Sequence, residues 1–397
     1  MNYRLPMCRL CFILFLCNLF LTRAFAGEND TTTHRLWSYE VNFHYAYIVE
    51  NYSVIPKSRN PVFVEFNPTV QTNGSKEWHH IFGFPKVGVS IIAGDLGNRE
   101  QLGYMFGAFP NFTFNTTNKK WYAPRVSLGL GLAYFTKTYS TRDSINFYVG
   151  SHITALAHAS VYVQPTLNKF MELKMGIAVT HCSNGHYQVP NLGINIPSFF
   201  VGLSYHPNVF PAKFERKDIS VPPSKVRFNI RTGIGIHELA RTFGPAGTPK
   251  YAVYITDLYL SKRYGKVSNV QVGMEIKHYN SYYNYIVKNE FFTTQQKLKA
   301  TVFTAFLAHE LMIGRFSLLT QGGVNIYNKF YDQYVLMYKS ERGLKAELKK
   351  YISTRLGLQY YLFDPKYCTR SNIFIGSYIK ANFGQADFIC TQLGFVF

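Results

Sequence analysis

A histidine and a serine stand two positions apart in the stretch THCSNGHYQVPNLGIN, residues 180–195. In an extended strand successive side chains point to opposite faces, so His181 and Ser183 share one face and Cys182 points the other way. A serine hydroxyl is a weak nucleophile until a neighbouring imidazole takes its proton. If a strand carries this pair, both side chains can act on the same substrate atom.

Residues 1–26 have the pattern of a secretory signal peptide. Arg4 and Arg9 come before or at the start of the apolar run CFILFLCNLFL, and Ala-Phe-Ala at 24–26 supplies the small residues of a cleavage site. The apolar run is too short to span a membrane as a helix. We therefore expect export of a mature chain that begins near Gly27.

The remaining chain is basic and poor in cysteine. The whole sequence carries a net charge of +20, and removing residues 1–26 takes away three arginines and no acid, which leaves about +17. Such a charge implies an anionic partner, nucleic acid or a lipid surface, and export favours lipid over nucleic acid. Only three cysteines remain after residue 26, too few for a disulfide framework. The sequence leaves two alternatives for Cys368 and Cys390, a disulfide bridge or two unpaired thiols.

Composition and patterning predict an all-β chain. Aromatic residues make up 17% and charged residues 16% of the sequence, yet beyond the signal peptide no apolar run is long enough for a transmembrane helix. Apolar residues instead alternate with small or polar ones, and Tyr and Phe recur near the segment ends. The segments are 86–94, 125–138, 172–181, 251–265, 269–279, 300–311 and 371–383. This pattern is typical of an antiparallel transmembrane β-barrel of the outer-membrane type; a soluble β-sandwich or barrel is the alternative.

The C-terminal residues fit the same interpretation. In ADFICTQLGFVF one face carries Ile389, Leu393, Phe395 and the terminal Phe397. A last strand that ends in phenylalanine resembles the assembly signal of bacterial outer-membrane proteins. We therefore expect an integral barrel of the cell outer membrane.

A proline-rich segment divides the strand pattern into two halves. Residues 207–225 contain four prolines and mixed charge, and they predict a linker. About eight strand candidates lie on each side, in 27–206 and in 226–397. These halves form either two small barrels or one larger barrel.

The two halves also end alike, as a degenerate repeat would. Gly202 and Gly394 lie 192 positions apart in similar apolar and aromatic surroundings. If the repeat is real, the second copy has lost the chemistry, because Ala381 and Asn382 stand where the first half has its histidine and serine.

The face that bears the histidine and the serine is apolar. Val179 and Ile177 continue it along the strand, and the apolar face of a membrane barrel faces lipid. Polar groups belong there only if the substrate is itself a lipid. With both chain ends on the periplasmic side, counting strands back from the C-terminus puts the loop 184–193 outside the cell and the pair near the outer leaflet.

HCSNGHYQVPNLGIN resembles the His-x-Ser-Asn motif of the outer-membrane lipid A 3-O-deacylases, the PagL-like acyloxyacyl hydrolase family. The resemblance covers about residues 35–206 and implies an eight-stranded barrel that removes an ester-linked acyl chain from the lipid A of lipopolysaccharide. It implies that Ser183 is the nucleophile and His181 its general base, with no cofactor and no metal. The groups that it implies for the oxyanion or the substrate are Asn184, Gly185 and Asn191. Each lost oxyanion donor would lower the rate about 100 to 1,000-fold.

One position departs from the family pattern. The family places an acidic residue about fourteen positions after the histidine to orient the ring, and this chain has Asn195 there. An amide can hold an imidazole but stabilises the imidazolium less than a carboxylate does. The open expectations are Asn195 as the third catalytic residue with lower activity, Glu172 or Asp95 in its role, or an inactive relative.

The alternatives to an esterase are a non-catalytic outer-membrane barrel, porin-like or adhesin-like, and a soluble secreted lipid-binding β-protein. HELAR from His237 and HELMI from His309 lack the second histidine of a zinc-protease helix, and His79-His80 beside Trp78 predicts an interfacial girdle rather than a metal site. We expect an outer-membrane carboxylic ester hydrolase surrounded by outer-membrane lipids; a homodimer is left open.

Overall fold

The computed structural model describes most of the chain after the expected signal peptide. The signal peptide and its cleavage site lie outside the described residues. The described residues are 36–50, 56–114, 122–140, 145–208, 214–220, 224–240, 247–338, 343–368 and 370–397. In these ranges no helix has both the length and the apolar character that a membrane crossing requires.

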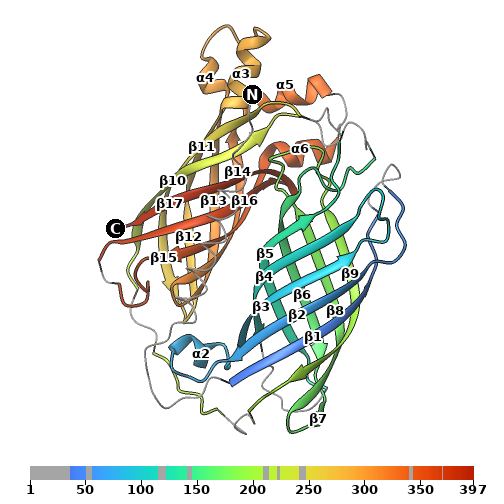
Figure 1. Ribbon diagram of the computed structural model, residues 1–397. Coiled ribbons are helices and arrows are strands. Elements are labelled where there is room, and N and C mark those ends of the chain that lie inside the picture. The colour runs from blue at the N-terminus through green and yellow to red at the C-terminus, as the bar shows by residue number, and fades with distance from the viewer. Residues whose placement is uncertain are drawn as a thin grey trace, which may run out of the picture. The chain divides into compact units, whose positions relative to one another are not determined.

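The N-terminal half forms a closed antiparallel barrel of eight strands (Figure 1). β6 pairs with both β5 and β8, and β1 pairs with β9, so the ring has no open edge. Among the described strands, the short β7 pairs with β8 alone. The strands are β1 (Leu36–Ala46), β2 (Val62–Gln71), β3 (Lys86–Asp95), β4 (Tyr104–Phe114), β5 (Arg125–Phe135), β6 (Ile153–Val163), β7 (Thr166–Asn168), β8 (Met171–Ser183) and β9 (Ile194–Tyr205).

The C-terminal half forms a second closed barrel, coloured yellow to red in Figure 1. Each strand pairs with the next, and β10 pairs with β17 to close the ring. The strands are β10 (Arg227–Glu238), β11 (Lys250–Tyr264), β12 (Ser268–Tyr279), β13 (Thr301–Ile313), β14 (Phe316–Tyr327), β15 (Ile352–Tyr361), β16 (Asn372–Asn382) and β17 (Gln385–Val396). The chain therefore forms two small barrels and not one large one, and the seven segments expected from alternation are all strands.

Short helices lie in the connections between strands. They are α2 (Glu77–Ile81), α3 (Asn280–Lys288), α4 (Gln296–Lys299), α5 (Lys329–Tyr338) and α6 (Leu344–Tyr351). Alternation at a period of two residues does not predict these segments. Aromatic packing joins α3 to α5: the rings of Tyr282 and Phe330 stack with their centroids 4.1 Å apart.

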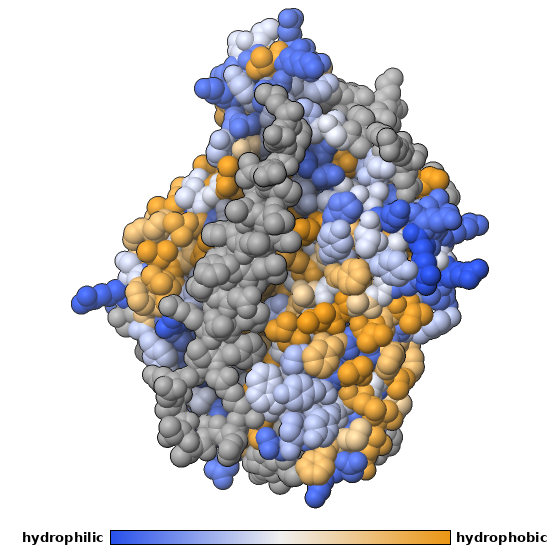
Figure 2. Space-filling view, in the orientation of Figure 1, coloured by the Kyte–Doolittle hydropathy of each residue, from blue (hydrophilic) through white to orange (hydrophobic). Residues whose placement is uncertain are grey.

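On both barrels many large apolar side chains are exposed, and many polar side chains are buried. Phe43 and Ile91 in the first barrel are 60% and 55% exposed, and Leu307 in the second is 61% exposed. Figure 2 shows hydrophobic residues gathered on the outer surface of the strands. Such a surface would be poorly soluble in water but suits the hydrocarbon of a bilayer, as in transmembrane β-barrels. The expected outer-membrane type of fold is confirmed.

The interior of the first barrel is crossed by hydrogen-bonded charged groups. Glu40 binds the ammonium of Lys174 at 2.7 Å, and Glu65 accepts hydrogen bonds from Asn42 at 2.8 Å and from the ring of His44 at 3.1 Å. All five side chains are buried. Buried charges are tolerated because each has partners, and removing one partner typically costs about 3–5 kcal/mol.

The interior of the second barrel is arranged in the same way. Asp257 accepts hydrogen bonds from Arg231 at 2.6 Å and from Arg355 at 2.9 Å, and Arg355 also binds Glu275. Arg231 and Asp257 have no exposed surface. Side chains therefore fill this part of the interior, in contrast to the water-filled channel of a porin.

Candidate active site

The candidate pair lies at the end of β8, on its outward face. His181 and, along the strand, Val179 and Ile177 are exposed, whereas Cys182 is 1% exposed and points inward. Ser183 is half-buried and is the last residue of the strand. The alternation that predicted a shared, lipid-type face for the histidine and the serine is thus observed.

The His181 ring is held by the neighbouring strand. His181 and Asn195 are cross-strand partners between β8 and β9, and His181 Nδ1 lies 2.7 Å from Asn195 Oδ1. With a carbonyl oxygen as the acceptor, Nδ1 carries the proton and Nε2 keeps its lone pair. Nε2 is then the nitrogen that can accept a proton from a hydroxyl.

The Ser183 hydroxyl receives two hydrogen bonds from the loop that follows it. Asn191 Nδ2 donates to Oγ at 2.9 Å, and the Gly185 amide donates at 3.2 Å. Two donors aimed at one oxygen favour negative charge on it or on an oxygen that takes its place. In the described part of the chain no hydrogen bond joins the His181 ring to Ser183; catalytic contacts are often long until a substrate binds.

Asn184 holds the loop 184–193 together. Its Nδ2 donates to Ser151 Oγ at 3.1 Å and to the carbonyl of Gln188 at 2.7 Å, and its Oδ1 accepts from the His186 amide at 2.9 Å. The side chain has no exposed surface. Both amide protons are used within the protein, so this conformation leaves none for a substrate oxygen. The sequence could not tell which of Asn184 and Asn191 would donate to the serine or the substrate. In the structure Asn191 bonds to Ser183, whereas Asn184 bonds to Ser151 and Gln188.

The comparisons with known families agree with this motif. Residues 63–204 match the family model described as lipid A 3-O-deacylase (PagL), and residues 226–397 match the model described as acyloxyacyl hydrolase, C-terminal domain. The chain belongs to the PagL acyloxyacyl hydrolase family. The similarity extends beyond the expected residues 35–206, because the second barrel matches a domain of the same family. No curated protein matches the chain.

Solved structures resemble this PagL family member only distantly. Neisserial surface protein A has 8% identity and a TM-score of 0.31, covering 43% of this chain and 96% of its own. Pseudomonas aeruginosa OccK5 (OpdH) has 9% identity and a TM-score of 0.20, covering 91% and 97%. Acinetobacter baumannii OccAB1 has 8% identity and a TM-score of 0.23, covering 91% and 95%. Similarities at this level carry no weight for fold or function.

The acids considered as substitutes for Asn195 are engaged elsewhere. Glu172 stands near the opposite end of β8 from His181 and lies 2.7 Å from the ring of His206. It lies nine residue steps along the strand from His181, about 30 Å at 3.3 Å per step. Asp95 accepts hydrogen bonds from Arg99 at 2.6 Å and from the Gly97 amide at 2.9 Å. Of the three expected orienting groups, Asn195 is the one that contacts the ring.

Gly193 is a site residue that sequence analysis missed. Its φ of +72° is one that side-chain-bearing residues rarely adopt, and an added Cβ would lie 3.1 Å from His181 Cε1 and 3.3 Å from the Cys182 carbonyl. Its amide donates to the Tyr148 carbonyl at 3.1 Å, which anchors the end of the loop. A glycine directly before the strand that carries Asn195 was the available signal.

We predict that Gly193→Ala lowers the turnover of a lipid ester substrate about 10 to 100-fold. The added methyl group displaces the His181 ring, and a shift of about 1 Å in a catalytic group can cost about 100-fold. The control is Gly265→Ala, where φ is also positive, at +60°, but where a Cβ meets no atom within 4 Å. Equal loss in both variants would show that a general effect of strained backbone on folding, and not contact with His181, is responsible.

A second serine, histidine and acid are bonded together inside the first barrel. Ser198 Oγ lies 3.1 Å from His44 Nδ1, and His44 Nε2 lies 3.1 Å from Glu65 Oε2. His44 is 3% exposed and faces the interior. The bonding pattern is that of a catalytic triad, but the histidine and the acid are buried inside the barrel, where a membrane lipid has no access.

The histidines and cysteines that the sequence analysis considered as metal ligands or as a disulfide have other environments in the structure. His79 and His80 are buried in α2, with Trp78 packed 4.1 Å from the His79 ring. His79 Nδ1 accepts a hydrogen bond from the Gly74 amide at 3.1 Å. Across the ranges that the structure describes, no three His, Cys, Asp or Glu side chains gather as metal ligands. Cys182, Cys368 and Cys390 are free thiols, so the bridge left open by the sequence is not formed.

Proposed function

We propose that this protein is a serine esterase that removes an ester-linked acyl chain from lipid A at the outer leaflet of the outer membrane. The observation that carries the proposal is the convergence of His181, Ser183 and two hydrogen-bond donors on the outward face of a barrel strand. Membership of a family described as lipid A 3-O-deacylase gives the substrate class.

The proposed chemistry follows from the roles that the geometry allows. Ser183 Oγ attacks the ester carbonyl carbon while His181 Nε2 takes the hydroxyl proton, and the carbonyl electron pair moves onto oxygen. We assign Asn191 Nδ2 and the Gly185 amide, which donate to Ser183 Oγ in the free protein, as the donors to that oxyanion. The sugar oxygen leaves with the proton from His181. Water then attacks the acyl-serine by the same steps and releases a fatty acid.

The position of the pair favours a substrate that stays in the membrane. On β6, the residues opposite Ser183 and His181 are Ala155 and Ala157, while Ile177 and Val179 on β8 are exposed. Small side chains beside the serine leave space for a chain, and apolar ones along the strand provide a surface for it. A water-soluble ester gains nothing from this surface, whereas an acyl chain in the bilayer already lies against it.

The porin-like alternative receives less support. Two buried ion pairs cross the interiors: Glu40 binds Lys174 in the first barrel, and Arg231 binds Asp257 in the second. A transport channel needs an open, hydrated path. A purely structural strand end also has no need for a histidine held in one tautomer beside a serine that accepts two hydrogen bonds.

The proposal is tested with the purified full-length protein in detergent micelles that contain lipid A. We expect mass spectrometry to show loss of one acyl mass from lipid A together with an equimolar free fatty acid. A matched incubation with an ether-linked analogue should give no product, because it has no carbonyl carbon to attack. Intact lipid A after prolonged incubation with correctly folded protein would contradict the proposal.

We predict that Asn195→Asp raises the turnover number about tenfold. A carboxylate in place of the amide still accepts the Nδ1 proton at 2.7 Å and also stabilises the imidazolium formed during attack. Asn195 is half-buried at the start of β9, where an added charge near the interface costs at most about 1 kcal/mol. Asn195→Ala should lower turnover instead. A slower Asp variant would show that this site is adapted to a neutral partner.

A further inference from the structure

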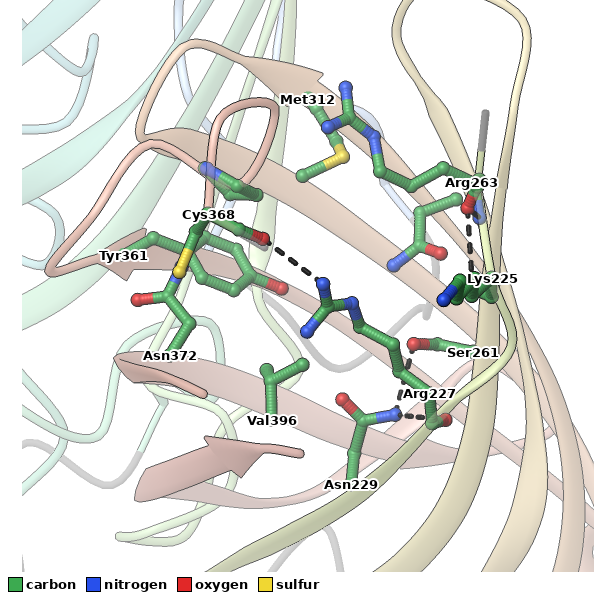
Figure 3. Close-up of a pocket in the computed structure, with 13 residues that line it drawn as sticks. Lys225, Arg227, Asn229, Ser261, Arg263, Met312, Tyr361, Cys368, Asn372 and Val396 are labelled. Carbon is green, nitrogen blue, oxygen red and sulfur yellow. Dashed lines mark hydrogen bonds between the residues drawn. The ribbon is translucent and has the colours of Figure 1, made fainter. Parts of the chain in front are cut away.

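A polar cavity lies within the second barrel, at the end where β10 begins and β17 finishes (Figure 3). Its volume is about 40 Å³, larger than the roughly 10–15 Å³ that one water molecule needs. The polar side chains that matter for its chemistry are Lys225, Arg227, Asn229, Arg263, Asn269 and Tyr361. None of these belongs to the candidate active site of the first barrel.

The cavity is lined by three cations and by no carboxylate. The Arg227 guanidinium is fixed by hydrogen bonds to the carbonyls of Arg370 at 2.8 Å and Cys368 at 3.1 Å, the second of which is drawn in Figure 3. Within the described residues, the side chains of Lys225 and Arg263 donate no hydrogen bond and form no ion pair. The half-buried Arg263 and the exposed Lys225 thus line a polar cavity with side-chain donors that no described residue uses.

The nearest acids do not neutralise this charge. Glu310 acts on Arg263 electrostatically but already accepts hydrogen bonds at 2.7–3.0 Å from Asn269, Gln271, Gln359 and Tyr361. Asp364 also acts on Arg263, and its Oδ1 accepts from the Lys366 amide at 2.9 Å. Counting both acids, the three lining cations remain in excess.

Asn269 has a buried acceptor atom that no residue in the described ranges satisfies. The residue is 6% exposed, and its Nδ2 donates to Glu310 Oε2 at 2.8 Å. Asn269 lines the cavity, and within the described residues its Oδ1 accepts no hydrogen bond. A buried polar atom left unpaired costs about 1–3 kcal/mol, so a ligand that brings a donor to this atom gains by supplying it.

We propose that this cavity binds a phosphate group that carries or adjoins a hydroxyl. The ionised phosphate oxygens accept from the unused donors of Arg263 and Lys225, and the hydroxyl donates to Asn269 Oδ1. Hydrogen phosphate has both features in one ion, and the phosphoglycerol headgroup of an anionic phospholipid has them in neighbouring groups. The proposal concerns the second barrel alone and does not depend on the esterase activity.

Calorimetry on the purified full-length protein in a neutral, phosphate-free detergent measures the affinity for sodium phosphate, glycerol 1-phosphate and sodium sulfate. Sulfate has the shape and charge of phosphate but no hydroxyl at neutral pH. We expect phosphate or glycerol phosphate to bind at least fivefold more tightly than sulfate. Equal binding of all three would overturn the role of Asn269, and no binding of any together with no lipid binding would overturn the site.

Arg263→Gln tests the cation directly, because the Arg263 side chain makes no hydrogen bond to any described residue, so its loss should not disturb the fold. We expect the dissociation constant for the bound phosphate to rise at least tenfold. Lys262→Gln is the matched control, since Lys262 is the exposed neighbour on β11, and it should leave binding unchanged. Unaltered affinity in Arg263→Gln would overturn the proposal.

The two sources of the phosphate group are separated in lipid nanodiscs. Native mass spectrometry with phosphatidylglycerol and with phosphatidylcholine should show retention of phosphatidylglycerol alone if the headgroup is the ligand, and this retention should weaken in Arg263→Gln. Tight binding of inorganic phosphate with no lipid retained would assign the cavity to a free anion. Equal retention of both lipids by the wild type and by Arg263→Gln would count against the lipid source.

Discussion

Ser183→Ala is expected to abolish release of the acyl chain from lipid A, with a loss of at least about 10⁴-fold in turnover. The alanine has no oxygen to attack the ester, and removing the nucleophile of such a site leaves only the catalysis provided by binding and the oxyanion donors. The barrel itself should be preserved, because Ser183 is half-buried at the end of β8 and fills no interior position. Fatty acid release, measured by mass spectrometry at matched protein concentration, gives the rate.

The second serine of the first barrel supplies the control for this loss. Ser198 lies 3.1 Å from His44, and His44 lies 3.1 Å from Glu65. By bonding pattern alone, these three residues resemble a catalytic triad more closely than Ser183, His181 and Asn195 do. Because that histidine and glutamate are buried inside the barrel, Ser198→Ala should retain activity within about a factor of two. A fluorophosphonate probe should label Ser183 in the wild type and leave Ser198 unmodified. If activity survived in Ser183→Ala but disappeared in Ser198→Ala, the nucleophile would be Ser198 and the active site would lie inside the barrel.

Much of the fold could be predicted from local alternation because a membrane barrel makes each strand obey the same rule. Segments such as 172–181 and 269–279 show one apolar face, and both are strands with that face outward. Closure is different, since β1 with β9 and β10 with β17 pair residues far apart in sequence. Periodicity contains no information about such pairs, so one large barrel and two small ones looked equivalent.

The site was predictable where it depends on strand geometry and unpredictable where it depends on the loop. A spacing of two residues fixed the shared face of His181 and Ser183. The partner of the histidine depends on the register of β8 with β9 across the loop 184–193, which aligns His181 with Asn195. In the loop, two buried asparagines have different roles, because backbone turns direct the Asn191 amide to Ser183 and the Asn184 amide to Ser151 and Gln188.

His181→Ala is expected to lower turnover about 10³ to 10⁵-fold, since Ser183 then has no base to accept its proton. Imidazole added to the reaction should restore part of the activity to this variant and none to Ser183→Ala. That rescue separates a role in proton transfer from a role in holding β8 and β9 together, because free imidazole is not attached to β8 and cannot link it to Asn195 on β9 as the His181 side chain does. His152→Gln is the matched control. The His152 ring is exposed near the start of β6 and lies 2.7 Å from the Phe135 carbonyl, so its loss should change turnover less than threefold.

If His181→Ala kept more than a tenth of the wild-type rate, the proton would have to reach solvent without the imidazole. The serine would then be activated by its two hydrogen-bond donors, Asn191 and the Gly185 amide, alone.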